Sequence, residues 1–232
     1  MTLVATQFTG FQPEAIQFLA DLAVNNERAW FQPRKAEYER LLKQPLEALC
    51  DVIAERFAAK GVPLTADRAR SPFRIYRDVR FSRNKEPYKT NIGASFPWTG
   101  GGHHDAGGYF HFQPGEMFAG GGMWHPDREW LTAWRATVDG DAGRVHAAID
   151  EPTFRATFGT VNGDRLKRVP PGFAADHPEA ELLKLKDVTF GRRLSDAEAL
   201  SAELPDILVE TFASGVPVYR LLGEIGQNGP PS

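Results

Sequence analysis

The sequence predicts an α+β fold, with an antiparallel or mixed central sheet flanked by N-terminal and C-terminal helices. Three observations predict this class. Apolar residues recur at helical spacing near both ends of the chain, alternating and turn-rich segments fill the middle, and the expected strands follow one another instead of alternating with helices. The 232 residues suit one large domain. We expect it to span residues 8–222, followed by a disordered tail over 223–232 that is poor in apolar residues.

Two helical segments are expected at the N-terminal end. Pro13 suits the first turn of a helix whose apolar residues keep a helical period until Asn25. A second helical pattern covers residues 38–57. Pro45 interrupts this pattern because it has no amide hydrogen, so we expect a break or kink near Gln44.

The middle of the chain carries the strand signals. Apolar and polar residues alternate from Phe73 to Phe81, which is typical of a strand, and residues 91–98 are expected to form another. Residues 108–113 and 117–123 then predict a hairpin that turns at Pro114 and Gly115. Three consecutive glycines in the second arm are expected to permit close backbone approach within a strand.

Helical patterns return after the hairpin. Pro126 is expected to start a helix, and residues 144–158 predict another that is broken by an internal proline. Residues 188–194 suit one more strand. Ser195 is expected to cap a last helical stretch that reaches Leu222.

Composition excludes several classes of protein. The single cysteine, Cys50, excludes an internal disulfide framework and a cysteine-rich zinc site, and its place in an apolar helical stripe predicts a packed thiol. No apolar run is long enough to span a membrane, and the first residues lack the pattern of a signal peptide. We therefore expect a cytoplasmic protein that does not bind a membrane.

The strongest functional signal is a basic segment between Arg68 and Lys89. It holds eight basic and two acidic residues, a local formal charge of +6 in a chain whose total is −3. Four aromatic residues are interspersed among these charges: Phe73, Tyr76, Phe81 and Tyr88. Such density requires cations that are solvated, paired with acids or facing an anion.

Several segments together resemble one known family. They are FTGFQPEAIQFLADLAVNNERAWFQPRKAEYE, RIYRDVRFSRNKEPYKTNIGASF, FAGGGMWHP and LKRVPPGFAADHP, in this order. By these segments the chain resembles the bacterial and fungal family named domain of unknown function 2461, from about Phe8 to Leu222. The resemblance implies a single domain and supplies no reaction.

Arg77 is the unusual residue of the expected strand, because it shares a face with apolar neighbours. A guanidinium there needs an internal carboxylate or a ligand carboxylate or phosphate, and the sequence leaves both alternatives open. We expect a basic strand-and-loop site for an anion. Its candidate ligand-binding residues are Arg77, Arg80, Ser82, Lys85, Tyr88, Lys89, Thr90, His111 and Arg168.

His125 is the candidate for proton transfer, since imidazole titrates near neutrality. A packed or capping role for this histidine remains an alternative. A metal site built from His111, His125 and a carboxylate such as Asp78 is a further alternative, although the helical spacing typical of metal-binding histidines is absent. The sequence therefore commits to no metal, and it identifies no cofactor.

These observations favour a protein that binds a small phosphorylated or carboxylated molecule, and they leave open whether it is also an enzyme. Nucleic-acid binding is an alternative because aromatic residues alternate with cations, but the acidic total charge and the absence of a known nucleic-acid motif argue against it. A third alternative is a protein-interaction module with an acidic partner. The sequence does not indicate an oligomeric state.

Overall fold

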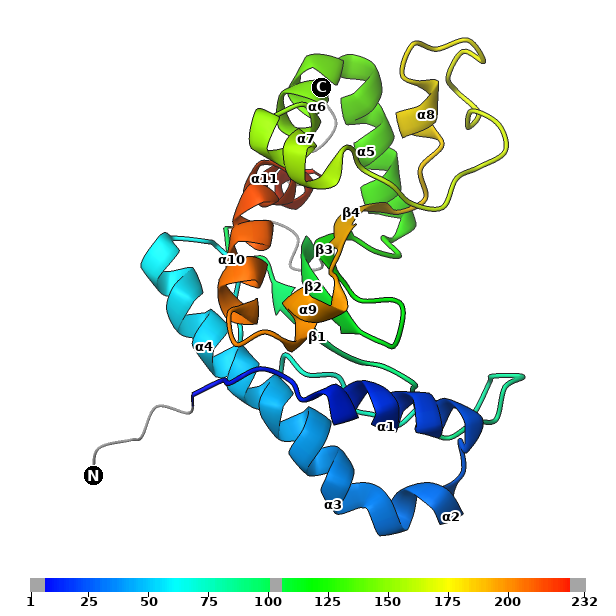
Figure 1. The fold of residues 1–232 in the computed structure, drawn as a ribbon. Coiled ribbons are helices and arrows are strands. Elements are labelled where there is room, and N and C mark those ends of the chain that lie inside the picture. Colours follow the sequence, from blue (N-terminus) through cyan, green and yellow to red (C-terminus); the bar gives the residue numbers. More distant parts are fainter. Residues whose placement is uncertain (1–6, 101–105, 226–232) are drawn as a thin grey trace.

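The computed structural model describes residues 7–100 and 106–225 and confirms the predicted α+β class (Figure 1). Its described strands form one antiparallel sheet in the order β1-β2-β3-β4. The strands are β1 (Ile92–Pro97), β2 (Ala106–Phe112), β3 (Phe118–Met123) and β4 (Val188–Arg193). The predicted hairpin is confirmed. Gly115 in its turn has a φ of 74°, which glycine adopts without the strain that a Cβ atom causes.

The two faces of the sheet differ in composition. Along the strand register, Ala94 pairs with Phe110 and Phe110 with Ala119, so these buried side chains share one face. On the other face, five of the twelve register positions are glycines. The cross-strand rows of that face are Gly93–His111–Phe118–Arg193, Ser95–Tyr109–Gly120–Gly191 and Pro97–Gly107–Gly122–Thr189.

The N-terminal segment is an almost continuous succession of helices. They are α1 (Pro13–Val24), α2 (Arg28–Phe31), η1 (Gln32–Arg34), α3 (Lys35–Tyr38), η2 (Glu39–Lys43) and α4 (Gln44–Lys60). The break predicted near Gln44 is a π-helical turn, η2, which ends at Lys43, two residues before Pro45. Pro45 has no amide hydrogen to donate to a carbonyl of the preceding turn. The helix widens into a π-turn there and continues instead of ending.

The C-terminal half supplies seven helices within the described residues. They are α5 (Arg128–Gly140), α6 (Ala142–Ile149), α7 (Pro152–Phe158), α8 (Ala180–Leu183), α9 (Asp196–Leu200), α10 (Leu204–Ser214) and α11 (Val216–Glu224). Ser195 caps α9 as predicted, through a capping box with Glu198. The helix expected at Pro126 begins two residues later, because Asp127 is its N-cap.

Helices from both ends of the chain cover the same face of the sheet. The ring of Phe96 on β1 lies 5.8 Å from Phe57 of α4 and 5.1 Å from Phe212 of α10. The ring of Tyr219 on α11 lies 5.1 Å from Phe190 of β4. Part of the core therefore lies between this face of the sheet and these three helices, which do not cover the glycine-rich face.

The strand predicted from Phe73 to Phe81 does not form as a regular strand. This segment doubles back on residues 87–94 through single bridges, and the backbone amide of Arg77 donates a hydrogen bond to the carbonyl of Pro87. The pairing then stops. Asp78 accepts hydrogen bonds from the backbone and the guanidinium of Arg80, and such local bonds compete with a strand ladder.

Two further predictions concern Cys50 and the C-terminal end of the packed chain. Cys50 is fully buried, and burial raises the pKa of its thiol to about 12, which confirms a packed thiol. We expected the packed part to end at Leu222, but α11 reaches Glu224 and Ile225 is buried, because this last isoleucine adds apolar surface to the core. The rest of the predicted tail, 226–232, lies outside the described residues.

No helix in the described ranges has both the length and the apolar character needed to cross a membrane.

Candidate functional site

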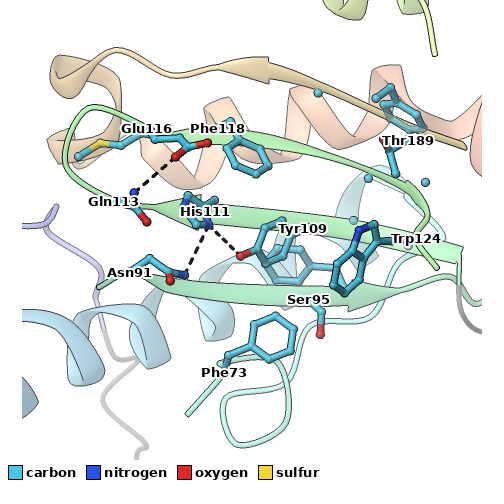
Figure 2. Close-up of a pocket in the computed structure, with 18 of the residues that line it drawn as sticks. Phe73, Asn91, Ser95, Tyr109, His111, Gln113, Glu116, Phe118, Trp124 and Thr189 are labelled. Atoms are coloured by element: carbon cyan, nitrogen blue, oxygen red, sulfur yellow. Dashed lines mark hydrogen bonds between the residues drawn. The ribbon is translucent and has the colours of Figure 1, made fainter. Parts of the chain in front are cut away.

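The glycine-rich face of the sheet carries a cavity of about 1190 Å³ (Figure 2). Its floor is the sheet itself. Gly107 and Gly122 are cross-strand partners on that floor, and neither has a side chain to fill the space above it. The volume exceeds the range of roughly 300–1,000 Å³ that is usual for small-molecule sites.

Aromatic rings form the walls of the cavity. Tyr109 projects from the middle of β2, with the Phe73 ring 5.9 Å away on one side and the Phe118 ring 5.7 Å away on the other. Trp124, just after β3, is 70% exposed and lines the same cavity. Figure 2 shows Trp124 and Thr189 towards one end of the sheet, with Gln113 and Glu116 at the other end.

Lys89 brings a cation to the cavity from the segment that precedes β1. Its ammonium nitrogen lies 5.0 Å from the centroid of the Phe73 ring. The pKa of Lys89 is lowered, first by burial and then by the positive charge of Arg74. Within residues 7–100 and 106–225, no carboxylate forms an ion pair with this ammonium group.

Three arginines line the cavity: Arg77 from the segment before β1, and Arg192 and Arg193 from the end of β4, of which Arg192 is paired with Glu198. Nη1 of Arg77 lies 3.1 Å from an Oε atom of Glu86, so the internal pair that the sequence left as one alternative is present. Arg193 lies at the end of β4, where the described part of the chain offers its guanidinium no ion pair. The acids that line the cavity are Asp78, which is paired with Arg80, and Glu116.

His111 lies in the floor, two residues after Tyr109 on the same face of β2. Its Nδ1 is 2.9 Å from the hydroxyl of Tyr109 and 3.5 Å from the side-chain amide nitrogen of Asn91 (Figure 2). The imidazole stacks on Phe118 at 4.8 Å between centroids. Burial is the main cause of a lowered pKa for His111, and burial raises the pKa of Tyr109 to about 12.

The structure brings three of the predicted ligand-binding residues to the cavity: Arg77, Lys89 and His111. Three others are engaged elsewhere. Tyr88 is buried against Phe31 with ring centroids 4.1 Å apart, Arg80 is paired with Asp78, and Lys85 donates to the carbonyl of Val79.

The remaining predicted ligand-binding residues do not line the cavity either. They are Ser82 and Thr90, which are half-buried, and the exposed Arg168. The predicted basic site is thus divided between a cavity wall and an outer loop, because the segment turns away from the sheet after Arg77.

His125, the candidate for proton transfer, lies outside the cavity wall. It has a φ of 51°, its amide donates to the buried carboxylate of Asp187 at 2.7 Å, and its ring stacks on Trp124 at 3.9 Å. Metal binding also lacks support in the described ranges, which contain no group of three histidine, cysteine, aspartate or glutamate side chains able to hold an ion.

Sequence reasoning missed several of the residues that line this cavity. They are Phe73, Asn91, Tyr109, Phe118, Trp124 and Arg193. A signal for some of them existed. In the expected strand 108–113, every second residue faces one side, and this would have grouped the phenol of Tyr109 with the imidazole of His111. Nothing local indicated that Phe73 would lie beside Tyr109, since that contact joins distant segments.

Comparison with known proteins identifies a family, and the description of that family names no activity. A family model described as "Conserved hypothetical protein (DUF2461)" matches residues 14–220, in agreement with the resemblance noted in the sequence. No curated protein and no solved structure matches the chain.

Proposed function

The chain belongs to the DUF2461 family of conserved hypothetical proteins, and from its cavity we propose that it binds a small phosphorylated or carboxylated molecule with a flat or apolar body. The cytoplasmic location expected from the sequence is part of this proposal. Catalysis is not required by it, because a cavity with cations and aromatic rings can bind without reacting.

The observation that carries the proposal is the position of Lys89. Its ammonium group is partly withdrawn from water beside Phe73, and no carboxylate of the described chain compensates for the lost hydration. A buried charge without a partner is costly, and an anionic ligand in the cavity would supply the missing partner. Charge-assisted hydrogen bonds to phosphate or carboxylate are among the strong polar interactions in proteins.

Arg77 supports the same end of the ligand. Its partner, Glu86, has a side chain that is 46% exposed. Exposed ion pairs contribute only about 0–1 kcal/mol, so a ligand phosphate can take the place of this carboxylate at little cost. The guanidinium then offers a planar pair of donors, which matches phosphate and carboxylate geometry.

The aromatic walls support a flat or apolar body for the ligand. Phe73, Tyr109 and Phe118 stand around the middle of the cavity, and the indole of Trp124 is open to solvent at one end. Rings in this setting stack on bases, other aromatic groups or the apolar faces of sugars. Nucleotides and phosphorylated aromatic metabolites combine such a body with an anion.

A thermal-shift panel of nucleotides, sugar phosphates and dicarboxylates tests the proposal. A ligand that binds only the folded protein raises Tm by mass action. We expect at least one member to stabilise the wild type, and Lys89→Ala to lose most of that stabilisation. Lys85→Ala is the matched control, because this exposed lysine lies outside the cavity wall. Equal responses from both variants would contradict the proposed site.

One observation favours nucleic-acid binding as a second candidate function. Phe81 is 96% exposed at the outer part of the basic segment, with the guanidinium of Arg80 5.9 Å from its ring centroid. Exposed rings beside arginines can stack on bases while the cations contact phosphates. A single-stranded oligonucleotide therefore belongs in the same panel. Strongly salt-dependent binding that Phe81→Ala abolishes and Lys89→Ala retains would favour this candidate.

A further inference from the structure

We infer that Tyr109 and His111 form a proton-transfer pair that faces the cavity and accepts a proton from a hydroxyl group of the bound molecule. This inference rests on the proposed function, because it needs a ligand in the cavity. It extends that function in two ways. The ligand carries an acidic hydroxyl group in addition to its anion, and the cavity removes the proton of that hydroxyl group.

The geometry of the pair follows from the sheet. Tyr109 and His111 are two residues apart on β2, so their side chains emerge from the same face, and both line the cavity. The phenol oxygen lies 2.9 Å from Nδ1 of the imidazole, a distance usual for a good hydrogen bond. Phe118 stacks on the imidazole from the neighbouring strand and fixes its plane.

The position of Asn91 assigns the roles in this hydrogen bond. Its side-chain amide nitrogen lies 3.5 Å from the same Nδ1, and an amide nitrogen can only donate. Nδ1 of His111 is therefore the accepting nitrogen, the imidazole proton is on Nε2, and the Tyr109 hydroxyl donates. A lone pair of the phenol oxygen can then accept a hydrogen bond from a ligand in the cavity.

The surroundings keep both groups neutral before a ligand arrives. Burial keeps the phenol protonated, since it raises the pKa of Tyr109 to about 12. Burial also lowers the pKa of His111, against the smaller opposite effects of the Glu116 charge and of a hydrogen bond that the imidazole donates to the Gln113 side chain. The other charges on the cavity wall are Arg77, Asp78 and Lys89 from the segment before β1, with the arginines at the end of β4.

The transfer conserves protons and charge. The ligand hydroxyl gives its proton to the phenol oxygen, while the phenol gives its own proton to Nδ1. The ligand becomes an oxyanion, Tyr109 is again a phenol, and His111 becomes an imidazolium. Lys89 supplies a positive charge to the same cavity, and the charge of Glu116 favours the imidazolium. Asn91 acts as a positioning residue that keeps Nδ1 free of a proton until the transfer.

Nitrogen NMR of the imidazole groups in the ligand-free protein tests the pair directly. We expect His111 to be neutral at pH 7 with its proton on Nε2. Tyr109→Phe should raise its titration midpoint, because the lost donor had stabilised the neutral form, and Asn91→Ala should shift it in the same direction. Tyr76→Phe, outside the cavity wall, should leave it unchanged. A proton on Nδ1, or no response to Tyr109→Phe, would overturn the pair.

A probe whose absorbance reports its ionisation tests the transfer itself. p-Nitrophenol is flat, carries one acidic hydroxyl and absorbs differently as phenol and phenolate. We expect the bound probe to ionise at lower pH in the wild type than in His111→Gln. Equal ionisation in both proteins would contradict the transfer while leaving the binding proposal intact. Failure of every panel ligand and of this probe to bind would instead contradict the proposed function and, with it, the transfer.

Discussion

Lys89 and Lys85 are four residues apart, but their ammonium groups lie in different environments. The Lys85 ammonium bonds to a backbone carbonyl on an exposed loop, whereas that of Lys89 lies over a phenyl ring on the cavity wall. Burial lowers the pKa of Lys89, and an anion placed beside it would raise that pKa again. The affinity for an anionic ligand should therefore decline as the pH rises towards the pKa of Lys89, because the ammonium group loses its charge.

His111 should make the stability of the protein depend on pH. Its pKa is lowered in the folded state, so the unfolded chain takes up a proton first as the pH falls below the ordinary value of 6.5. Protonation then favours unfolding, and the penalty is complete below the folded pKa. We expect the urea midpoint of the wild type to fall relative to that of His111→Gln between about pH 7.5 and about pH 5. A difference that stays constant over this range would contradict the account.

At the scale of the element, the glycines of the sheet explain why one face is hollow. A Cβ atom on Gly107 would lie 2.6 Å from the carbonyl oxygen of Phe96, so even a methyl group must displace backbone. Gly107→Ala should destabilise the protein by about 1–3 kcal/mol, as measured by urea unfolding.

Gly140→Ala is the matched control for that substitution. Gly140 is the last residue of α5, and an added Cβ atom would have no neighbour within 4 Å. Alanine is the better helix former there, so we expect unchanged or slightly higher stability, by up to about 1 kcal/mol. A wild-type stability for Gly107→Ala would mean that the strands have room which the sheet does not show.

The segment that holds Arg77 shows where pattern alone fails. Alternation predicted a strand from Phe73 to Phe81, and the first part does pair with residues 87–94. Asp78 then bonds to Arg80, and Pro87 has no amide to donate on the returning arm. The alternating pattern does not report this competition between local and ladder hydrogen bonds.

At the scale of the whole molecule, the sequence predicted the class of fold well because its signals are local. Helical periods, proline positions, the hairpin turn and the Ser195 cap each depend on a few neighbouring residues. The cavity depends on distant ones. Phe73 reaches Tyr109 and β4 brings Arg193 beside Phe118 only through tertiary contacts and strand register, which single-sequence patterns do not encode.

The most direct test of the central claim is NMR of the lysines after reductive methylation with 13C-formaldehyde, in the presence and absence of a phosphorylated ligand. Each dimethyl-lysine then reports its own titration. We predict that Lys89 titrates below the ordinary lysine value in the free protein and that the ligand raises the midpoint of Lys89. A Lys89 signal that titrates at the ordinary lysine value and does not respond to any phosphate or carboxylate would contradict an anion site in this cavity.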